Sequence, residues 1–123
     1  MGQALLYVAA ALTGLWGISH LFATRGAVAG FGDVSIDNRR VITMEWITEG
    51  VALISTAAFV AFVAAIEPHA RVSSAVFAVA IATLVTLAVV SIFTGFRIAF
   101  LPYRLCPFIF VLSAVLIAVG AWA

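Results

Sequence analysis

The chain has 123 residues, of which 66% are apolar and 9% are charged, and its net charge is +1. An ordinary soluble domain has about 25% charged residues, so this chain lacks the residues for a polar coat. It has no lysine, which excludes Schiff-base chemistry, and its single cysteine, Cys106, excludes an internal disulfide. The small net charge argues against nucleic acid as a partner. Composition therefore predicts an integral membrane protein whose main partner is the lipid bilayer.

Four apolar stretches fill most of the sequence, and each approaches the roughly 20 residues that a helix needs to cross a bilayer. We expect an all-α, integral membrane four-helix bundle that forms one transmembrane domain over residues 1–123. The expected helices are at about 3–22, 41–66, 72–96 and 105–122. The N-terminal apolar run has neither a positive n-region nor a cleavage pattern, and we interpret it as a retained helix.

The first helix contains Gly14 and Gly17, which allow a neighbouring helix to approach closely. A glycine-rich polar stretch follows, and we predict it to be a long loop over residues 23–40, with Asp37 as the N-cap of the second helix. The second helix should end before Pro68. Pro102 lies in the predicted third turn, and Pro107 is tolerated in the first turn of the fourth helix.

Arginine placement predicts the orientation. Arg71 alone lies in the second loop, and the other five arginines lie in or beside the first and third loops: Arg25, Arg39, Arg40, Arg97 and Arg104. The positive-inside rule then places the long first loop and the third loop in the cytoplasm, with both termini on the outer side. We expect the setting of such a protein to be the bacterial inner (plasma) membrane.

Glu45 and Glu49 are the most informative polar pair, because their i, i+4 spacing puts them on one helix face. A carboxylate inside the bilayer costs a few kcal/mol, so Glu49 should face the bundle interior and be protonated or paired. Two carboxylates one turn apart also resist ionising together. This arrangement is typical of a proton-handling site. The alternative is that both carboxylates lie at the membrane surface and pair with Arg97 or Arg104.

His20 lies near the same end of the first helix, where the loop can bring it beside the two carboxylates. An imidazole with two carboxylates can act as acid/base machinery or ligate a metal. No HxxxH or ExxH pairing is present, so we predict no metal site and take Glu45, Glu49 and His20 as the candidate catalytic residues. The sequence indicates no particular cofactor.

Four more residues are candidate ligand-binding residues: Trp16, Trp46, Arg97 and Asp33. Trp16 lies one turn from His20 on the same face, as a pocket wall or a core residue. Trp46 is either a pocket wall or an interfacial belt residue. Arg97 either pairs with Glu49 or extends to the lipid headgroups. Asp33 belongs to the long polar loop, which we expect to act as a lid.

Two segments resemble known families. Residues 15–22, with Gly17 and His20, and residues 45–53, with Glu49 followed by Gly50, resemble the small DoxX-like four-helix membrane proteins. That resemblance implies a four-helix bundle, often an accessory to a redox or stress-response system. A shorter segment, Asp37-Asn38 followed by Met44-Glu45 and Thr48, is similar to the sterol isomerase and sigma-2 receptor superfamily, which implies a sterol-like ligand. The later helices do not align with that superfamily.

Three functions follow from these features. The leading hypothesis is a bundle that binds a small hydrophobic or amphipathic molecule in a cytoplasm-facing cavity with a proton-active Glu/Glu/His cluster, as an isomerase-like enzyme or a carrier. The second is an accessory or assembly subunit, which would dock a partner or copies of itself through two small-residue faces, Gly14/Gly17 and the Ala-rich third helix. The third is a proton-coupled transporter formed by oligomerisation, although no pair of broken helices is visible.

Overall fold

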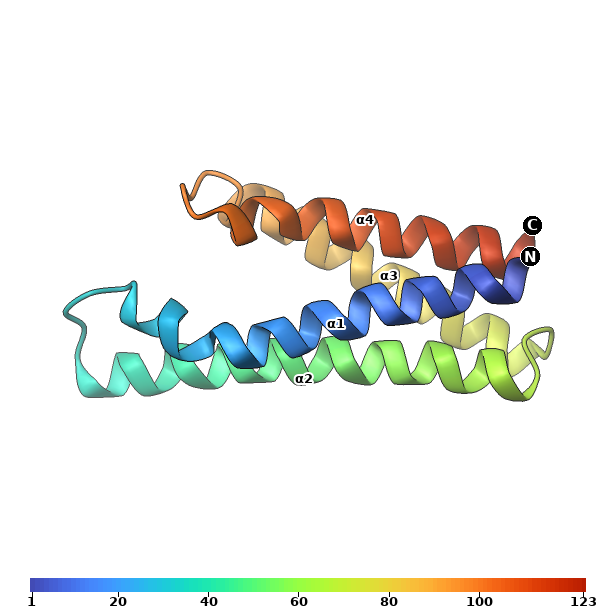
Figure 1. The fold of residues 1–123 in the computed structure, drawn as a ribbon, viewed down its shortest axis with the longest axis horizontal. Helices are drawn as coiled ribbons and strands as arrows, with labels where there is room; N and C mark the ends of the chain where they lie inside the picture. The colour runs from blue at the N-terminus through green and yellow to red at the C-terminus, as the bar shows by residue number, and fades with distance from the viewer.

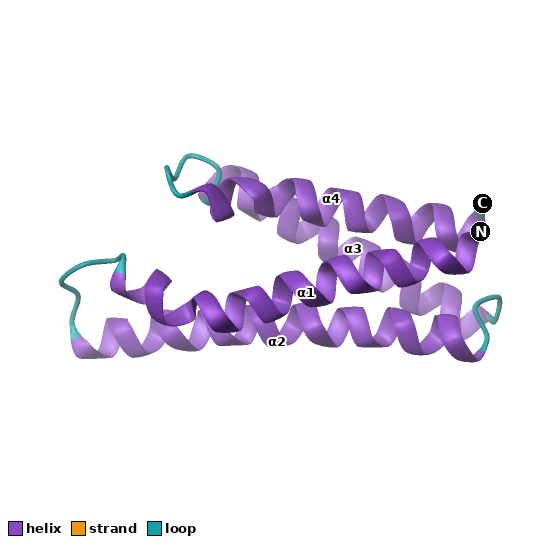
Figure 2. Cartoon of the chain, in the orientation of Figure 1, coloured by secondary structure: helices purple, strands orange, loops and turns teal.

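The computed structural model describes all 123 residues and contains four α-helices and no strands. The helices are α1 (Gly2–Ala29), α2 (Ile36–Ile66), α3 (Arg71–Thr94) and α4 (Leu101–Trp122). They run up and down as a bundle in which α1 lies between α2 and α4, and α3 crosses behind (Figure 1). Short loops connect the consecutive helices (Figure 2). The all-α four-helix bundle is as predicted.

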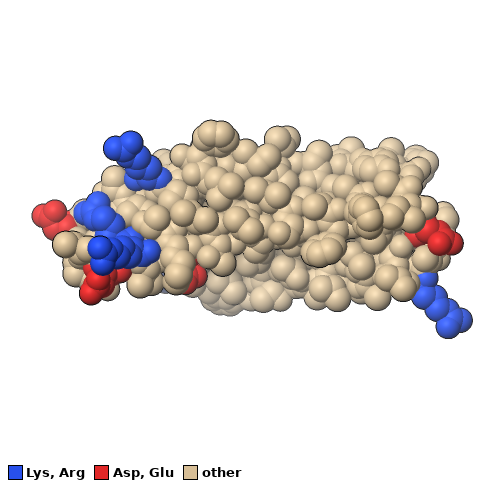
Figure 3. Space-filling model, turned by 90° about the horizontal axis from the view of Figure 1, so that it is seen from below, with Lys and Arg blue, Asp and Glu red and all other residues tan.

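All four helices are long and apolar enough to cross a membrane. Most of their large apolar side chains point outward, which suits a lipid environment and not water. Charged side chains gather at the two ends of the bundle and leave the middle bare (Figure 3). This distribution is the mark of an integral membrane protein.

The first loop is much shorter than we predicted. Helix α1 continues through Gly26 to Ala29, and α2 already begins at Ile36, so only residues 30–35 connect them. A single glycine inside a helix lowers the helix stability by about 1 kcal/mol relative to alanine. A long helix with surrounding alanines and valines tolerates this loss. The chain turns at Gly32, which has a φ of 71°. A loop of six residues is too short for the lid that we expected over residues 23–40.

Two helix ends also differ from the prediction. Ser35, and not Asp37, caps α2, because its side chain accepts a hydrogen bond from the Asn38 backbone N–H (3.1 Å). Helix α4 begins at Leu101, so Pro102 occupies the first turn and Pro107 lies inside the helix. Proline in the first turn leaves no backbone hydrogen bond unmade, which explains why the helix starts before Pro102.

The helix ends near the two termini are tied together. A Cβ on Gly2 would be 2.6 Å from the carbonyl oxygen of Gly120, so α1 and α4 touch through their backbones there. The Gln3 side chain donates a hydrogen bond to the carbonyl oxygen of Ala64 at the end of α2 (2.8 Å). These contacts hold three helix ends at one level and let α3 and α4 diverge from α1 and α2 at the opposite end (Figure 1).

The core lies along the bundle axis and is made of small and large apolar side chains in alternation. Phe77 and Phe110 are its largest fully buried side chains, and Ala9, Ala57 and Ala80 fill the closer contacts. Helix α3 packs mainly on α4 and touches α2 only sparsely. The polar and aromatic cluster at the arginine-rich end of the bundle is therefore built mainly from side chains of α1, α2 and α4.

Candidate functional site

The site begins with a backbone contact between α1 and α2. A Cβ on Gly17 would lie 2.7 Å from the carbonyl oxygen of Gly50, and a Cβ on Gly50 would lie 2.9 Å from that of Gly17. Only glycine permits such an approach, as the Gly14/Gly17 pattern predicted. Gly14 meets the Cβ of Ala57 on the same face. This face is consumed inside the bundle, so it is not free to dock a partner.

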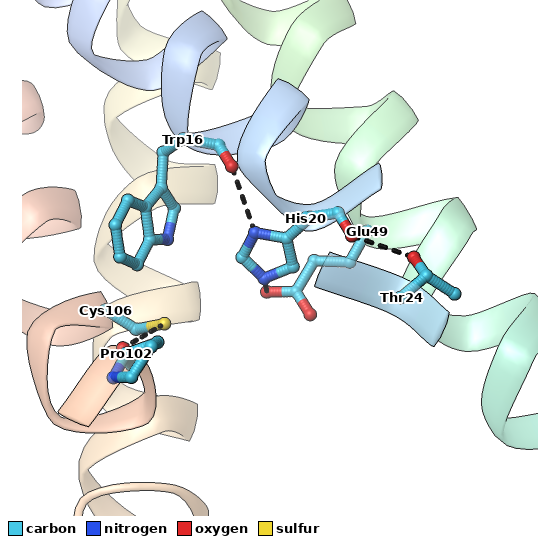
Figure 4. Close-up of polar contacts among 6 residues, drawn as sticks. All are labelled: Trp16, His20, Thr24, Glu49, Pro102 and Cys106. Carbon is cyan, nitrogen blue, oxygen red and sulfur yellow. Dashed lines mark hydrogen bonds and ion pairs between the residues drawn. The ribbon is translucent and has the colours of Figure 1, made fainter. Parts of the chain in front are cut away.

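The close approach brings His20 of α1 against Glu49 of α2. The two atoms His20 Nε2 and Glu49 Oε1 are 3.6 Å apart, within ion-pair distance (Figure 4). The His20 side chain is 7% exposed and that of Glu49 is 38% exposed. The pair therefore joins a buried imidazole to a carboxylate that reaches the surface of the bundle.

Backbone contacts orient the imidazole. His20 Nδ1 lies 3.1 Å from the carbonyl oxygen of Trp16, and Thr24 Oγ1 donates to the carbonyl oxygen of His20 (2.8 Å; Figure 4). A carbonyl oxygen can only accept, so the contact at Nδ1 is a hydrogen bond when Nδ1 carries the proton. In the neutral ring, Nε2 then presents a lone pair toward Glu49. A lone pair and a carboxylate repel each other, so one exchangeable proton between them stabilises the pair.

Aromatic rings enclose His20. The Trp46 ring lies against it at 5.0 Å between centroids and 30° between planes, and the Trp16 ring meets it edge-on at 6.0 Å. Tyr103 of α4 packs edge-on against Trp46 at 5.7 Å. Phe100 in turn packs against Tyr103 at 5.9 Å. Three helices thus contribute to one aromatic cluster around the imidazole.

This cluster surrounds a cavity of about 140 Å³ that is lined mainly by Trp16, His20, Trp46, Phe100, Tyr103 and Cys106. A second space, of about 260 Å³, is lined by Glu49, Tyr103 and Cys106 together with the end of α3. A third, of about 330 Å³, lies between the end of α1 and Tyr103. Tyr103 lines all three. His20 faces the first space and Glu49 the second, so their contact spans the partition between the two.

The site lies toward one end of the four apolar helices. Eighteen residues separate His20 from Gly2, seventeen separate Glu49 from Ile66 and nineteen separate Tyr103 from Trp122. At 1.5 Å per residue, all three lie about 26–29 Å from the tied ends of the bundle. The hydrocarbon core of a bilayer is roughly 30 Å thick. The cluster therefore lies nearly one hydrocarbon thickness away from the tied ends, at the end of the bundle with most of the arginines.

Three predicted site residues stand apart from the cluster. Glu45 is exposed and has no ion-pair partner, although it is one turn from Glu49. Arg97 is exposed in the third loop and does not pair with Glu49, whose ion-pair partner is His20. Asp33 is exposed in the first loop. The expected Glu/Glu/His cluster is thus a His20–Glu49 pair.

Tyr103 and Phe100 are the residues that sequence reasoning missed. We interpreted Phe100-Leu101-Pro102-Tyr103 as a turn, whereas Leu101 and Pro102 open α4 and aim Tyr103 inward. Cys106 lies one turn further on, and its thiol donates to the carbonyl oxygen of Pro102 (3.4 Å; Figure 4). A tyrosine next to a helix-opening proline is the signal that could have pointed to this wall.

No group of three or more His, Cys, Asp or Glu side chains in the chain could hold a metal ion. The chemistry open to the site is that of one imidazole–carboxylate pair beside aromatic rings and a thiol. Such a site can bind a ring-containing or otherwise apolar molecule and exchange a proton with it.

Fold and site together define an integral membrane four-helix bundle with a polar pair at one end. No protein-family model, no curated protein and no solved structure matches the chain. The resemblances to DoxX-like proteins and to the sterol isomerase superfamily therefore stay predictions.

Proposed function

We propose that the protein binds a small hydrophobic or amphipathic molecule in the aromatic cavity at its arginine-rich end, and that the His20–Glu49 pair exchanges a proton with the bound molecule. An isomerase-like enzyme and a carrier both fit this description. The two share the binding step, which is the part that the geometry supports best.

One observation carries the proposal. His20 is buried among Trp16, Trp46 and the cavity, yet its Nε2 is 3.6 Å from a carboxylate that lines the neighbouring crevice. Placing a carboxylate such as that of Glu49 inside a membrane is costly. A histidine that served only packing would not need such a partner. Glu49 lines the space of about 260 Å³ and His20 lines the cavity of about 140 Å³. The pair can therefore take up a proton from the first of these and present it in the second.

The accessory-subunit alternative loses one of its two docking faces. The Gly14/Gly17 face packs against Gly50 and Ala57 of α2, whereas the outward face of the Ala-rich α3 is exposed. Ligand binding by the single chain is the simpler proposal, because every residue that lines the cavity comes from one chain.

The proposed setting is the bacterial inner membrane, with the site at the cytoplasmic face and both termini outward. Support comes from the five arginines at the site's end against Arg71 at the other. Single cysteines in a Cys106→Ser background test this orientation. Asp33→Cys should react with a membrane-impermeant maleimide only after the cells are opened, and His69→Cys should react in intact cells. The reverse pattern would invert the topology.

Native mass spectrometry of the detergent-solubilised protein tests the binding proposal. Wild type should retain a specific small molecule, which Glu49→Gln and His20→Ala should lose. Glu45→Gln is the matched control, because Glu45 is one turn away, exposed and unpaired. If all four proteins carry the same molecules, or none does, the site is not a binding centre.

A further inference from the structure

The indole N–H of Trp16 is a buried donor without a strong acceptor. Its Nε1 atom is shielded from solvent and makes no hydrogen bond to an oxygen or nitrogen atom. Figure 4 shows the nitrogen edge of the ring turned toward His20 and Cys106, which line the same cavity. The Cys106 thiol is the hydrogen-bond partner nearest to this N–H, but a thiol sulfur is only a weak acceptor. Buried tryptophan N–H groups usually find a good hydrogen-bond acceptor, and an oxygen atom in the cavity would supply one for Trp16.

The cavity beside this donor is small and lined with rings. Its volume of about 140 Å³ is close to that of the engineered apolar cavity, about 150 Å³, that binds benzene. Trp16, Trp46, Phe100 and Tyr103 supply flat walls, and Pro102 supplies a further apolar surface. A small volume with aromatic walls suits one planar six-membered ring better than a branched or elongated chain.

We infer that the ligand class is a compact six-membered ring that carries a hydroxyl or keto oxygen, and that the oxygen accepts a hydrogen bond from the Trp16 N–H. This inference rests on the proposed function and names what the proposed cavity selects. The ring stacks within the aromatic walls, and the oxygen gives the buried Trp16 N–H a strong acceptor.

His20 and Glu49 give the oxygen a second role. Trp16 and His20 are one helical turn apart on α1, and His20 Nδ1 is already engaged with the carbonyl oxygen of Trp16. An oxygen held by the Trp16 N–H therefore lies on the same wall as the imidazole whose Nε2 meets Glu49. A proton on that pair is then within one turn of the oxygen that it would neutralise. Larger apolar substituents can extend toward the space of about 330 Å³ that shares Phe100 and Tyr103 with the cavity.

Phenol and toluene test the inference, because they have nearly the same shape and only phenol carries an oxygen. The readout is protection of Cys106, the single cysteine, from a small methanethiosulfonate reagent, since Cys106 lines the cavity. Each ligand is titrated against full-length wild type and Trp16→Phe. Comparing the two proteins for one ligand cancels that ligand's partition into detergent, as in a double-mutant cycle. Trp122→Phe, at the opposite end and exposed, is the matched control.

We expect Trp16→Phe to weaken protection by phenol about tenfold relative to protection by toluene, the effect of one lost hydrogen bond to a buried donor. Trp122→Phe should leave the ratio unchanged. Equal protection by both ligands, with a ratio that Trp16→Phe does not move, overturns the oxygen-bearing class and leaves the binding proposal standing. If neither ligand protects Cys106, the binding proposal and this inference both fall.

Discussion

Gly17 and Gly50 form a backbone-to-backbone contact between α1 and α2 that sets the position of the whole site. A Cβ on Gly17 would lie 2.7 Å from the Gly50 carbonyl oxygen and 2.9 Å from the Leu53 Cβ. Gly50 directly follows Glu49, and Gly17 is one turn before His20. The contact that brings the helices together is therefore the contact that brings the imidazole to the carboxylate.

Gly17→Ala should separate α1 from α2 and destabilise the fold by about 1–3 kcal/mol, the cost of overpacking a tight interface. Unfolding in mixed micelles measures this change. Gly26→Ala is the matched control, because Gly26 is in the same helix and a Cβ there would meet nothing within 4 Å. That change should stabilise by up to about 1 kcal/mol through helix propensity. Equal effects from the two substitutions would refute the close contact.

Much of the fold follows from the sequence, because four long apolar runs in 123 residues permit few arrangements besides a helical bundle. The first loop could not be delimited, because Gly26 is tolerated inside α1 and Ser35, not Asp37, caps α2. Both are matters of local competition that composition does not resolve.

The site was predictable in part. His20 and Glu49 were expected together, and the Gly17/Gly50 contact makes it so. Glu45 shares a face with Glu49 by spacing, yet nothing packs over it, because burial depends on the neighbouring helix and not on the helix's own period. Tyr103 comes from a distant part of the chain, so its place could not be read from local pattern.

Phe110→Ala should destabilise the bundle by about 2–3 kcal/mol, less than the roughly 3–5 kcal/mol typical of a soluble core. Phe110 is fully buried between the helices, so its removal leaves a cavity. The unfolded helices remain in apolar lipid, however, and little transfer free energy is lost. Phe62→Ala is the control, because that ring is 64% exposed toward the lipid and its removal leaves no internal void. The same unfolding titration compares the two. A loss for Phe62→Ala as large as that for Phe110→Ala would contradict the assigned core.

Ser35→Ala should destabilise the start of α2 by about 1 kcal/mol, since it removes the acceptor for the Asn38 N–H. Amide hydrogen exchange over the first turn of α2 is the suitable measurement, because fraying there is local. Asp37→Asn keeps the cap and removes an exposed ion pair with Arg40. Exposed ion pairs stabilise a fold by about 0–1 kcal/mol. Faster exchange in Asp37→Asn than in Ser35→Ala would restore Asp37 as the cap.

Tyr103→Ala should open the partition between the two spaces that meet at the His20–Glu49 pair. Tyr103 lines both, and Cys106, which is 8% exposed, lies one turn beyond it on α4. Burial slows the reaction of a thiol, so wild type should react slowly but measurably with a small maleimide, and Tyr103→Ala should react more than about tenfold faster. Tyr103→Phe, which keeps the ring, should react like wild type, and so should Tyr7→Ala near the opposite end of the bundle. Unchanged reactivity in Tyr103→Ala would mean that the ring does not separate the crevice from the cavity, and the proton exchange between them would need another route.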